Sequence, residues 1–163
     1  MSGKPTNPIP KRRVAKSATP SKPAKNLCFA CGKDNLHGMH LKFIHDKKRG
    51  GFTCRFRLSK RYSGPPGHCH GGIIATILDD AMGKLNKLRQ VTAVTAQMSI
   101  DFLKPVPLNQ PLRVESRELR VNGRRHFHMA EIVNQKGDVL ARSRGVFVEI
   151  DPEKPFAKYI KTM

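Results

Sequence analysis

The sequence predicts an α+β domain, in which one long helix covers an antiparallel β-sheet. Most of the chain alternates between apolar and polar residues, which is the spacing of half-buried strands. Only residues 72–88 carry apolar residues at helical spacing. The dipeptide Asn122-Gly123 stands between two alternating runs and is the strongest short signal for a β-hairpin. The predicted order of elements is β-β-α-β-β-β-β, which is typical of an α+β arrangement.

The chain begins with a segment that predicts no packed structure. Residues 1–26, "MSGKPTNPIPKRRVAKSATPSKPAKN", are rich in Pro, Ser, Lys and Arg, contain no acidic residue, and predict a basic disordered tail. The tail is either a solubilising extension or a contact for nucleic acid or an anionic surface. The domain is expected over residues 27–152, followed by a loosely ordered tail over 153–163. No secretory signal and no apolar run of membrane-spanning length is visible, so a cytoplasmic protein without a membrane span is expected.

The strands are predicted in chain order from their alternation. Residues 39–59 form two alternating runs about a turn at Lys47–Gly51 and predict a hairpin. Residues 92–107 predict the strand that follows the helix, residues 111–133 predict two strands joined at Asn122-Gly123, and residues 137–150 predict the last strand. In the strand after the helix, the residues expected to share one apolar face are Val94, Ala96, Met98, Ile100 and Phe102.

The predicted helix has an apolar stripe and two adjacent carboxylates. At 100° per residue, one face is formed by Ile73, Ile74, Ile77, Leu78, Ala81 and Leu85, and it should pack on the sheet. Asp80 lies at the edge of this stripe, where it should reach water. Asp79 lies nearly opposite, among small and apolar neighbours, so a partner subunit or a ligand is expected to cover it. An ordinary surface aspartate on an alanine-rich helix is the alternative.

The helix begins with two glycines directly after a histidine, in "HCHGG". The first N–H groups of a helix have no intrahelical acceptor, and the helix dipole makes that end mildly positive. Without Cβ atoms, Gly71 and Gly72 would let a carbonyl oxygen approach these donors closely. This is the geometry of an oxyanion hole or an anion site. A plain junction between a loop and a helix is the alternative.

Three motifs resemble those of the hotdog-fold acyl-CoA thioesterases of the PaaI-like type: "CFACGKDNLHGMHLKF", "YSGPPGHCHGGIIATILDDAMG" and "TAQMSIDFLKPVPL". The resemblance implies a sheet wrapped around one central helix and a homodimer or a dimer of dimers. It places His70 and Gly71 at the thioester carbonyl and Asp79, from the other subunit, as the general base or nucleophile. It also implies that Thr95 orients the attacking water from the polar side of its strand, beside Gln97, Ser99 and Asp101.

The net charge of +19 gains a meaning from the same resemblance. Coenzyme A carries a pyrophosphate and a 3′-phosphate, which favour Lys and Arg. The resemblance places the hairpin Asn122, Gly123, Arg124 and Arg125 beside the CoA moiety. CoA is part of the substrate, so no separate cofactor is expected. A non-catalytic acyl-CoA-binding domain is the second function considered, although a sensor has no need of Asp79.

Four cysteines and seven histidines leave a metal site to consider. Cys28-x-x-Cys31 and His37-x-x-His40 have the residue types of a zinc site, but the five-residue gap between the pairs is shorter than the usual gap of about twelve. A tight turn with buried thiols is preferred, and no metal is expected. Cys69 is not needed as a nucleophile, and His126 and His128 are expected to lie on a basic strand face without a ligand.

Overall fold

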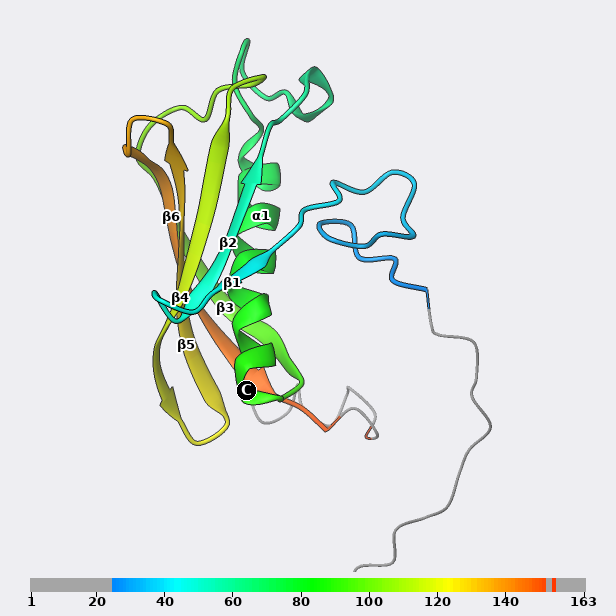
Figure 1. Cartoon of the computed structure of the whole chain (residues 1–163), viewed down its shortest axis with the longest axis vertical. Helices are drawn as coiled ribbons and strands as arrows, with labels where there is room; N and C mark the ends of the chain where they lie inside the picture. The colour runs from blue at the N-terminus through cyan, green and yellow to red at the C-terminus, as the bar shows by residue number, and fades with distance from the viewer. Residues whose placement is uncertain (1–24, 152–153, 155–163) are drawn as a thin grey trace, which may run out of the picture.

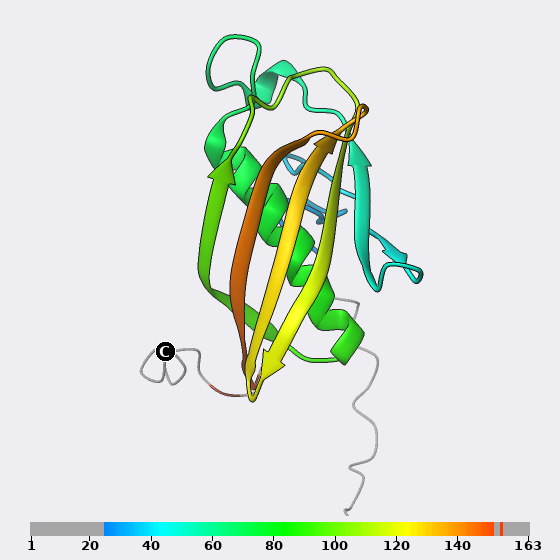
Figure 2. The same ribbon diagram turned by 90° about the vertical axis from the view of Figure 1, so that its left-hand side faces the viewer.

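The computed structural model describes residues 25–151 and residue 154. Helix α1 (Gly71–Gly83) lies along one face of a six-stranded antiparallel sheet, which curves around it (Figures 1 and 2). The α+β prediction and the order of its elements are therefore confirmed. The order of strands across the sheet is β1-β2-β4-β5-β6-β3. Their bounds are β1 (Ile44–Asp46), β2 (Gly51–Phe56), β3 (Ala93–Phe102), β4 (Leu112–Asn122), β5 (Arg125–Asn134) and β6 (Val139–Glu149).

Almost all of the two predicted tails, residues 1–26 and 153–163, lies outside the described residues. Within the described residues, the helices are too short or too polar to cross a membrane. The described chain from residue 25 onward therefore carries the fold, and the basic tail stays a prediction.

Helix α1 buries the predicted stripe, but it ends earlier than expected. Ile77, Leu78 and Ala81 have no exposed surface and form the centre of the core. The α-helix stops at Gly83, and the chain continues to Arg89 as a 3-10 helix (Lys84–Arg89). Glycine is a poor helix former, which explains why the helix type changes at Gly83. The prediction of one helix to Leu88 was therefore wrong in type beyond Gly83.

The first predicted strand is shorter than its alternation suggests. Strands β1 and β2 pair as the expected antiparallel hairpin, but β1 begins only at Ile44. Just before it, the N–H groups of Met39 and Leu41 donate to the carbonyls of Phe29 and Ala30, at 2.8 and 2.9 Å. Residues 39–41 are therefore bonded to the preceding loop and cannot extend the sheet.

Strand β3 contains a β-bulge that reverses its predicted faces. Thr95 pairs with Phe147 and Gln97 pairs with Val146, so Ala96 is an extra residue on the β3 side. Phe147 is buried beneath α1, and directly opposed residues point to the same face of a sheet, so Thr95 faces the helix together with Met98. Two predictions were wrong here, the common face of Val94 and Ala96 with Met98 and the polar face of Thr95.

The β4–β5 hairpin turns one residue later than predicted. Asn122 pairs with Arg125, so the two loop residues are Gly123 and Arg124 and not Asn122 and Gly123. Gly123 has a φ of 56°, and a positive φ at the first loop residue is required in type II′ turns, which favour glycine there. The hairpin itself is confirmed.

The two edges of the sheet differ. One edge is the three-residue strand β1, and the other is the ten-residue strand β3, whose outer side pairs with no strand in the described chain. Figure 2 shows β3 at the side of the sheet, next to the helix. A long strand edge of this kind presents unpaired N–H and C=O groups to another chain.

Candidate active site

The first turn of α1 presents one backbone N–H that no group in the described chain accepts. His70 is the N-cap residue, and its Nδ1 accepts a hydrogen bond from the Gly72 N–H at 2.9 Å. The His70 carbonyl accepts from the N–H groups of Ile73 and Ile74. The Gly71 N–H is left without an acceptor among the described residues. Gly72, predicted as a second donor, is already engaged, so Gly71 alone can donate to a ligand.

A cavity of about 400 Å³ opens beside Gly71. Its wall is mostly apolar, and the lining includes Pro65, His68, Cys69, Ile74, Phe102 and Val106. A Cβ atom at Gly71 would lie 3.5 Å from the Phe102 ring, which is an ordinary van der Waals contact. Burial raises the pKa of the Cys69 thiol to about 11, which leaves it uncharged at neutral pH and agrees with its expected lack of a nucleophilic role.

Asp79 meets Thr95 at the free edge of the sheet. The Thr95 hydroxyl donates a hydrogen bond to Asp79 Oδ1 at 2.7 Å. Asp79 was predicted to face away from the sheet of its own chain, and this was wrong, because its carboxylate reaches edge strand β3. Met82, one of the apolar residues near Asp79 on the helix, is fully buried. Asp79 itself remains half-buried, so part of its surface is left for a ligand or a partner.

Gly71 and Asp79 are too far apart in one chain to act on one bond. They are eight residues apart on α1, and a rise of about 1.5 Å per residue separates them by about 12 Å along the helix axis. A base and an oxyanion donor must each lie about 3 Å from the reacting group. The structure therefore forms two half-sites on one helix, one at Gly71 and one at Asp79 with Thr95.

Asp80 is more covered than predicted, because a loop leaves only 16% of its side chain exposed. Its Oδ1 lies 3.4 Å from Cys31 Sγ and 3.3 Å from Lys84 Nζ, and its Oδ2 is buried without a hydrogen-bond partner in the described part of the chain. Lys84 Nζ also lies 2.6 Å from Cys31 Sγ. Burial raises the pKa of the Cys31 thiol to about 11 despite the nearby ammonium. Asp80 therefore belongs to a structural cluster behind the helix.

The zinc alternative of the sequence analysis is not supported. Cys28 and Cys31 lie together beside Asp80, but exposed His37 and His40 lie outside this cluster. The tight turn is confirmed, because the Gly32 N–H donates to the Cys28 carbonyl at 2.8 Å. Burial of both thiols was wrong for Cys28, which is exposed.

The hairpin predicted to contact CoA lies at the opposite end of the helix from Gly71, beside the C-terminal end of α1 (Figure 1). The Arg124 guanidinium donates to the Glu149 carbonyl, at 3.1 Å for its closer nitrogen. Arg125 is exposed and pairs with Val148, which in turn pairs with Val94. The hairpin thus lies two strands from the Thr95 end of β3 and belongs with the Asp79 half-site.

His126 and His128 are buried, contrary to the prediction of a basic outer face. They are 1% and 0% exposed and share the helix-facing side of β5 with Ala130 and Ile132. Their spacing of two residues, continuing that of Ala130 and Ile132, was the sequence signal for this face. Sequence reasoning missed them because alternation alone does not say which face of a strand is buried.

Comparison with known proteins identifies the fold and its relatives. Residues 66–141 match the sequence profile of the thioesterase superfamily. An acyl-coenzyme A thioesterase, THEM4 of Rattus norvegicus, is 30% identical over 119 residues, which cover 72% of this chain and 51% of that protein. The chain thus spans about half the length of the curated relatives it matches.

Solved structures give the same result. A crystal structure of a thioesterase superfamily protein has a TM-score of 0.71 and 29% identity, and covers 76% of this chain and 60% of that one. The PaaI protein of E. coli, from the phenylacetic acid degradation operon, has a TM-score of 0.63 and 22% identity, with 68% and 80% covered. The second likeness concerns the fold alone.

Proposed function

The chain belongs to the thioesterase superfamily and has its hotdog fold, and on this basis we propose that it hydrolyses an acyl-CoA to the free acid and CoA. One observation carries the proposal. The Gly71 N–H, which nothing in the described chain accepts, lies at an apolar cavity of about 400 Å³. A backbone donor beside an apolar cavity suits a thioester carbonyl whose acyl chain is apolar.

The complete site takes two chains in this proposal. Thr95 lies near the start of β3, and Phe102, whose ring adjoins Gly71, lies at its end. If two copies of β3 pair antiparallel along their free edges, the Thr95 end of one strand comes beside the Phe102 end of the other. Asp79 then approaches the partner's Gly71. A homodimer with two equivalent sites follows, and a dimer of dimers would leave these sites intact.

The residues act on the thioester in a simple sequence. Asp79 accepts a proton from water while the water oxygen attacks the thioester carbon, and the partner's Gly71 N–H donates to the oxyanion that forms. The carbon–sulfur bond then breaks, and the CoA thiolate takes up a proton. The Thr95 hydroxyl occupies Asp79 Oδ1, so Oδ2 is free for the proton. Direct attack by Asp79 through an anhydride is the alternative route.

Adjacent carboxylates give a matched test of the base. Asp79→Asn should fold and bind CoA but lower kcat by about 10²–10⁴-fold, which is the usual contribution of a positioned general base. Asp80→Asn removes a carboxylate that the Cys31 loop covers and should keep kcat within a few-fold of the wild type. Release of free CoA from acyl-CoAs of different chain lengths measures both variants. Full activity of Asp79→Asn would contradict the proposal.

Binding of the CoA phosphates is assigned to the β4–β5 hairpin. Arg125 is exposed there, and Arg124 adjoins the end of β6. Replacing both by Ala should raise KM more than it lowers kcat, because a phosphate contact binds ground state and transition state alike. An unchanged KM would mean that these arginines do not contact the CoA phosphates.

Sedimentation of the wild type at assay concentration should give a dimer or larger, and a fully active monomer would refute the shared site.

A further inference from the structure

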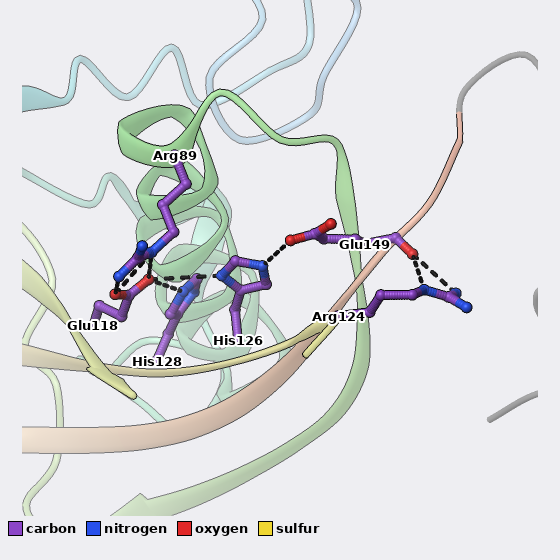
Figure 3. A network of polar contacts seen from close by, with 6 residues as sticks. All are labelled: Arg89, Glu118, Arg124, His126, His128 and Glu149. Atoms are coloured by element: carbon purple, nitrogen blue, oxygen red, sulfur yellow. Dashed lines mark hydrogen bonds and ion pairs between the residues drawn. The ribbon is translucent and has the colours of Figure 1, made fainter. Parts of the chain in front are cut away.

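A second cluster of polar side chains lies on the helix-facing side of the sheet near the β4–β5 hairpin, two strands from Thr95. It consists of Glu118 from β4 and His126 and His128 from β5, and Figure 3 shows the three side chains converging. Glu118 pairs directly with His128 across the two strands. All three side chains lie on the helix-facing side of the sheet, where the two histidines are buried.

Three of the four ring nitrogens in this cluster lack a well-formed hydrogen bond within the described residues. His126 Nδ1 lies 3.6 Å and His128 Nε2 lies 3.7 Å from Glu118 Oε2, which is too long for a hydrogen bond. Within the described residues, His126 Nδ1 and both ring nitrogens of His128 are buried and make no hydrogen bond of ordinary geometry, although the Met82 backbone lies close enough to His128 for a looser polar contact. Buried polar groups in native proteins are nearly always paired, so this cluster calls for an explanation.

The spacing of the three atoms suits a metal ion. Zn²⁺ binds histidine nitrogen and carboxylate oxygen at about 2.0–2.2 Å in tetrahedral geometry, so two ligand atoms lie about 3.3–3.4 Å apart. The two distances to Glu118 Oε2 exceed this by only a few tenths of an ångström. Two imidazoles and one carboxylate are also the ligand types that zinc and its neighbouring transition metals take.

The groups behind the ligands fit the same role. His126 Nε2 lies 2.7 Å from Glu149 Oε1, so it donates its proton there and directs the Nδ1 lone pair toward Glu118. Arg89 Nε donates to both Glu118 oxygens at 3.0 and 2.9 Å and fixes that carboxylate.

We propose that Glu118, His126 and His128 bind one divalent transition-metal ion, with Zn²⁺ as the best fit. The ion joins β4 to β5 inside the core. His126 lies in one row across the sheet with Phe147 and Thr95. The bound ion therefore braces the end of the sheet that carries Thr95 and acts on the structure, not on the thioester.

The other cluster of possible ligands in the described chain is Cys28, Cys31 and Asp80. An ammonium already fills the cation position there, because Lys84 Nζ lies 3.3 Å from Asp80 Oδ1 and 2.6 Å from Cys31 Sγ. Arg89 likewise pairs with Glu118, but Lys84 contacts two of the three possible ligands of its cluster, whereas Arg89 hydrogen-bonds only Glu118 among the three residues of the other. The cysteine cluster serves as the competing site in the experiment.

Metal binding is measured on the full chain after treatment with a chelator. The chain is dialysed against Zn²⁺ and its metal content is determined by mass spectrometry, and Co²⁺ serves as a spectroscopic probe. The wild type, a Cys28→Ser/Cys31→Ser variant and the surface control His37→Asn should each retain one equivalent of Zn²⁺. Glu118→Gln should lose it. Glu149→Gln keeps all three ligands and should bind about 10–100-fold more weakly, as expected for an outer hydrogen-bond partner.

Three outcomes would overturn the proposal. They are a wild type that retains no stoichiometric Zn²⁺, a Glu118→Gln variant that binds as well as the wild type, and loss of the ion in the cysteine double variant. A thiolate-to-cobalt charge-transfer band in the wild type would likewise assign the ion to the cysteines. Circular dichroism of each metal-free variant verifies folding. If Glu118→Gln does not fold, unweakened binding in Glu149→Gln overturns the proposal by itself.

Discussion

Two variants that are each inactive should restore activity when their chains are mixed. Gly71→Val should block the proposed oxyanion donor, and Asp79→Asn should remove the proposed base. Along α1 these positions are about 12 Å apart, so in the proposed dimer each complete site would take one of them from each chain. In a mixed dimer, one site carries both changes and the other carries neither. Gly71→Val should fold, because the Phe102 ring that it would meet is 59% exposed and can move.

The expected recovery follows from the pairing statistics of a two-fold dimer. Equal amounts of the two variants, unfolded and refolded together, pair at random and give mixed dimers in about half of the molecules. Each mixed dimer has one intact site of two, so activity should return to about a quarter of the wild type. Each variant alone should stay at least about 10²-fold below the wild type.

Release of free CoA, followed with a thiol reagent, is the assay. The control is each variant refolded alone at the same total concentration. If each site lay within one chain, both chains of a mixed dimer would be inactive and mixing would restore no activity. A mixture no more active than its components would therefore refute the shared site, provided that size analysis shows that mixed dimers have formed.

Three further results are expected. Thr95→Ala should lower kcat about tenfold and leave KM unchanged, because it releases the 2.7 Å hydrogen bond that orients Asp79, and Thr95→Ser should restore most of the rate. Asp80→Asn should lower the free energy of unfolding by about 1–3 kcal/mol in urea titrations, because the Lys84 ammonium loses its counter-charge. Iodoacetamide at pH 8 should modify exposed Cys28 well before Cys31, whose pKa of about 11 leaves about one thiol in a thousand ionised at that pH, and mass spectrometry should show the two extents converging as the pH is raised toward 11.

Most of the fold could be predicted because its signals are local. The apolar stripe of α1 and the glycine-containing hairpin at Gly123 depend on neighbours a few residues away. Features that depend on contacts between distant segments could not be predicted from the sequence. The pairing of residues 39–41 with the preceding loop, which shortens β1, is one such contact.

The same distinction between local and distant signals applies to the candidate site. Gly71 and Asp79 stand out by residue type within the helix, so they could be named from the sequence. The face of Thr95 could not, because one extra residue at Ala96 reverses the alternation and no residue type marks a bulge. The burial of Asp80 depends on the Cys31 loop, which is 49 residues away in the chain. A helical wheel contains no information about such a loop.

The unequal edges of the sheet bear on how far assembly can proceed. The β3 edge is ten residues long and has Asp101 as its one charged residue, whereas β1 has three residues and leads into a turn with Lys47, Lys48 and Arg49. Short edges and positive charge discourage strand addition. Two chains joined through β3 would present only β1 at both outer margins. Growth of the sheet would stop there, so the pair should stay a discrete particle even at high concentration, with no continuation into fibres.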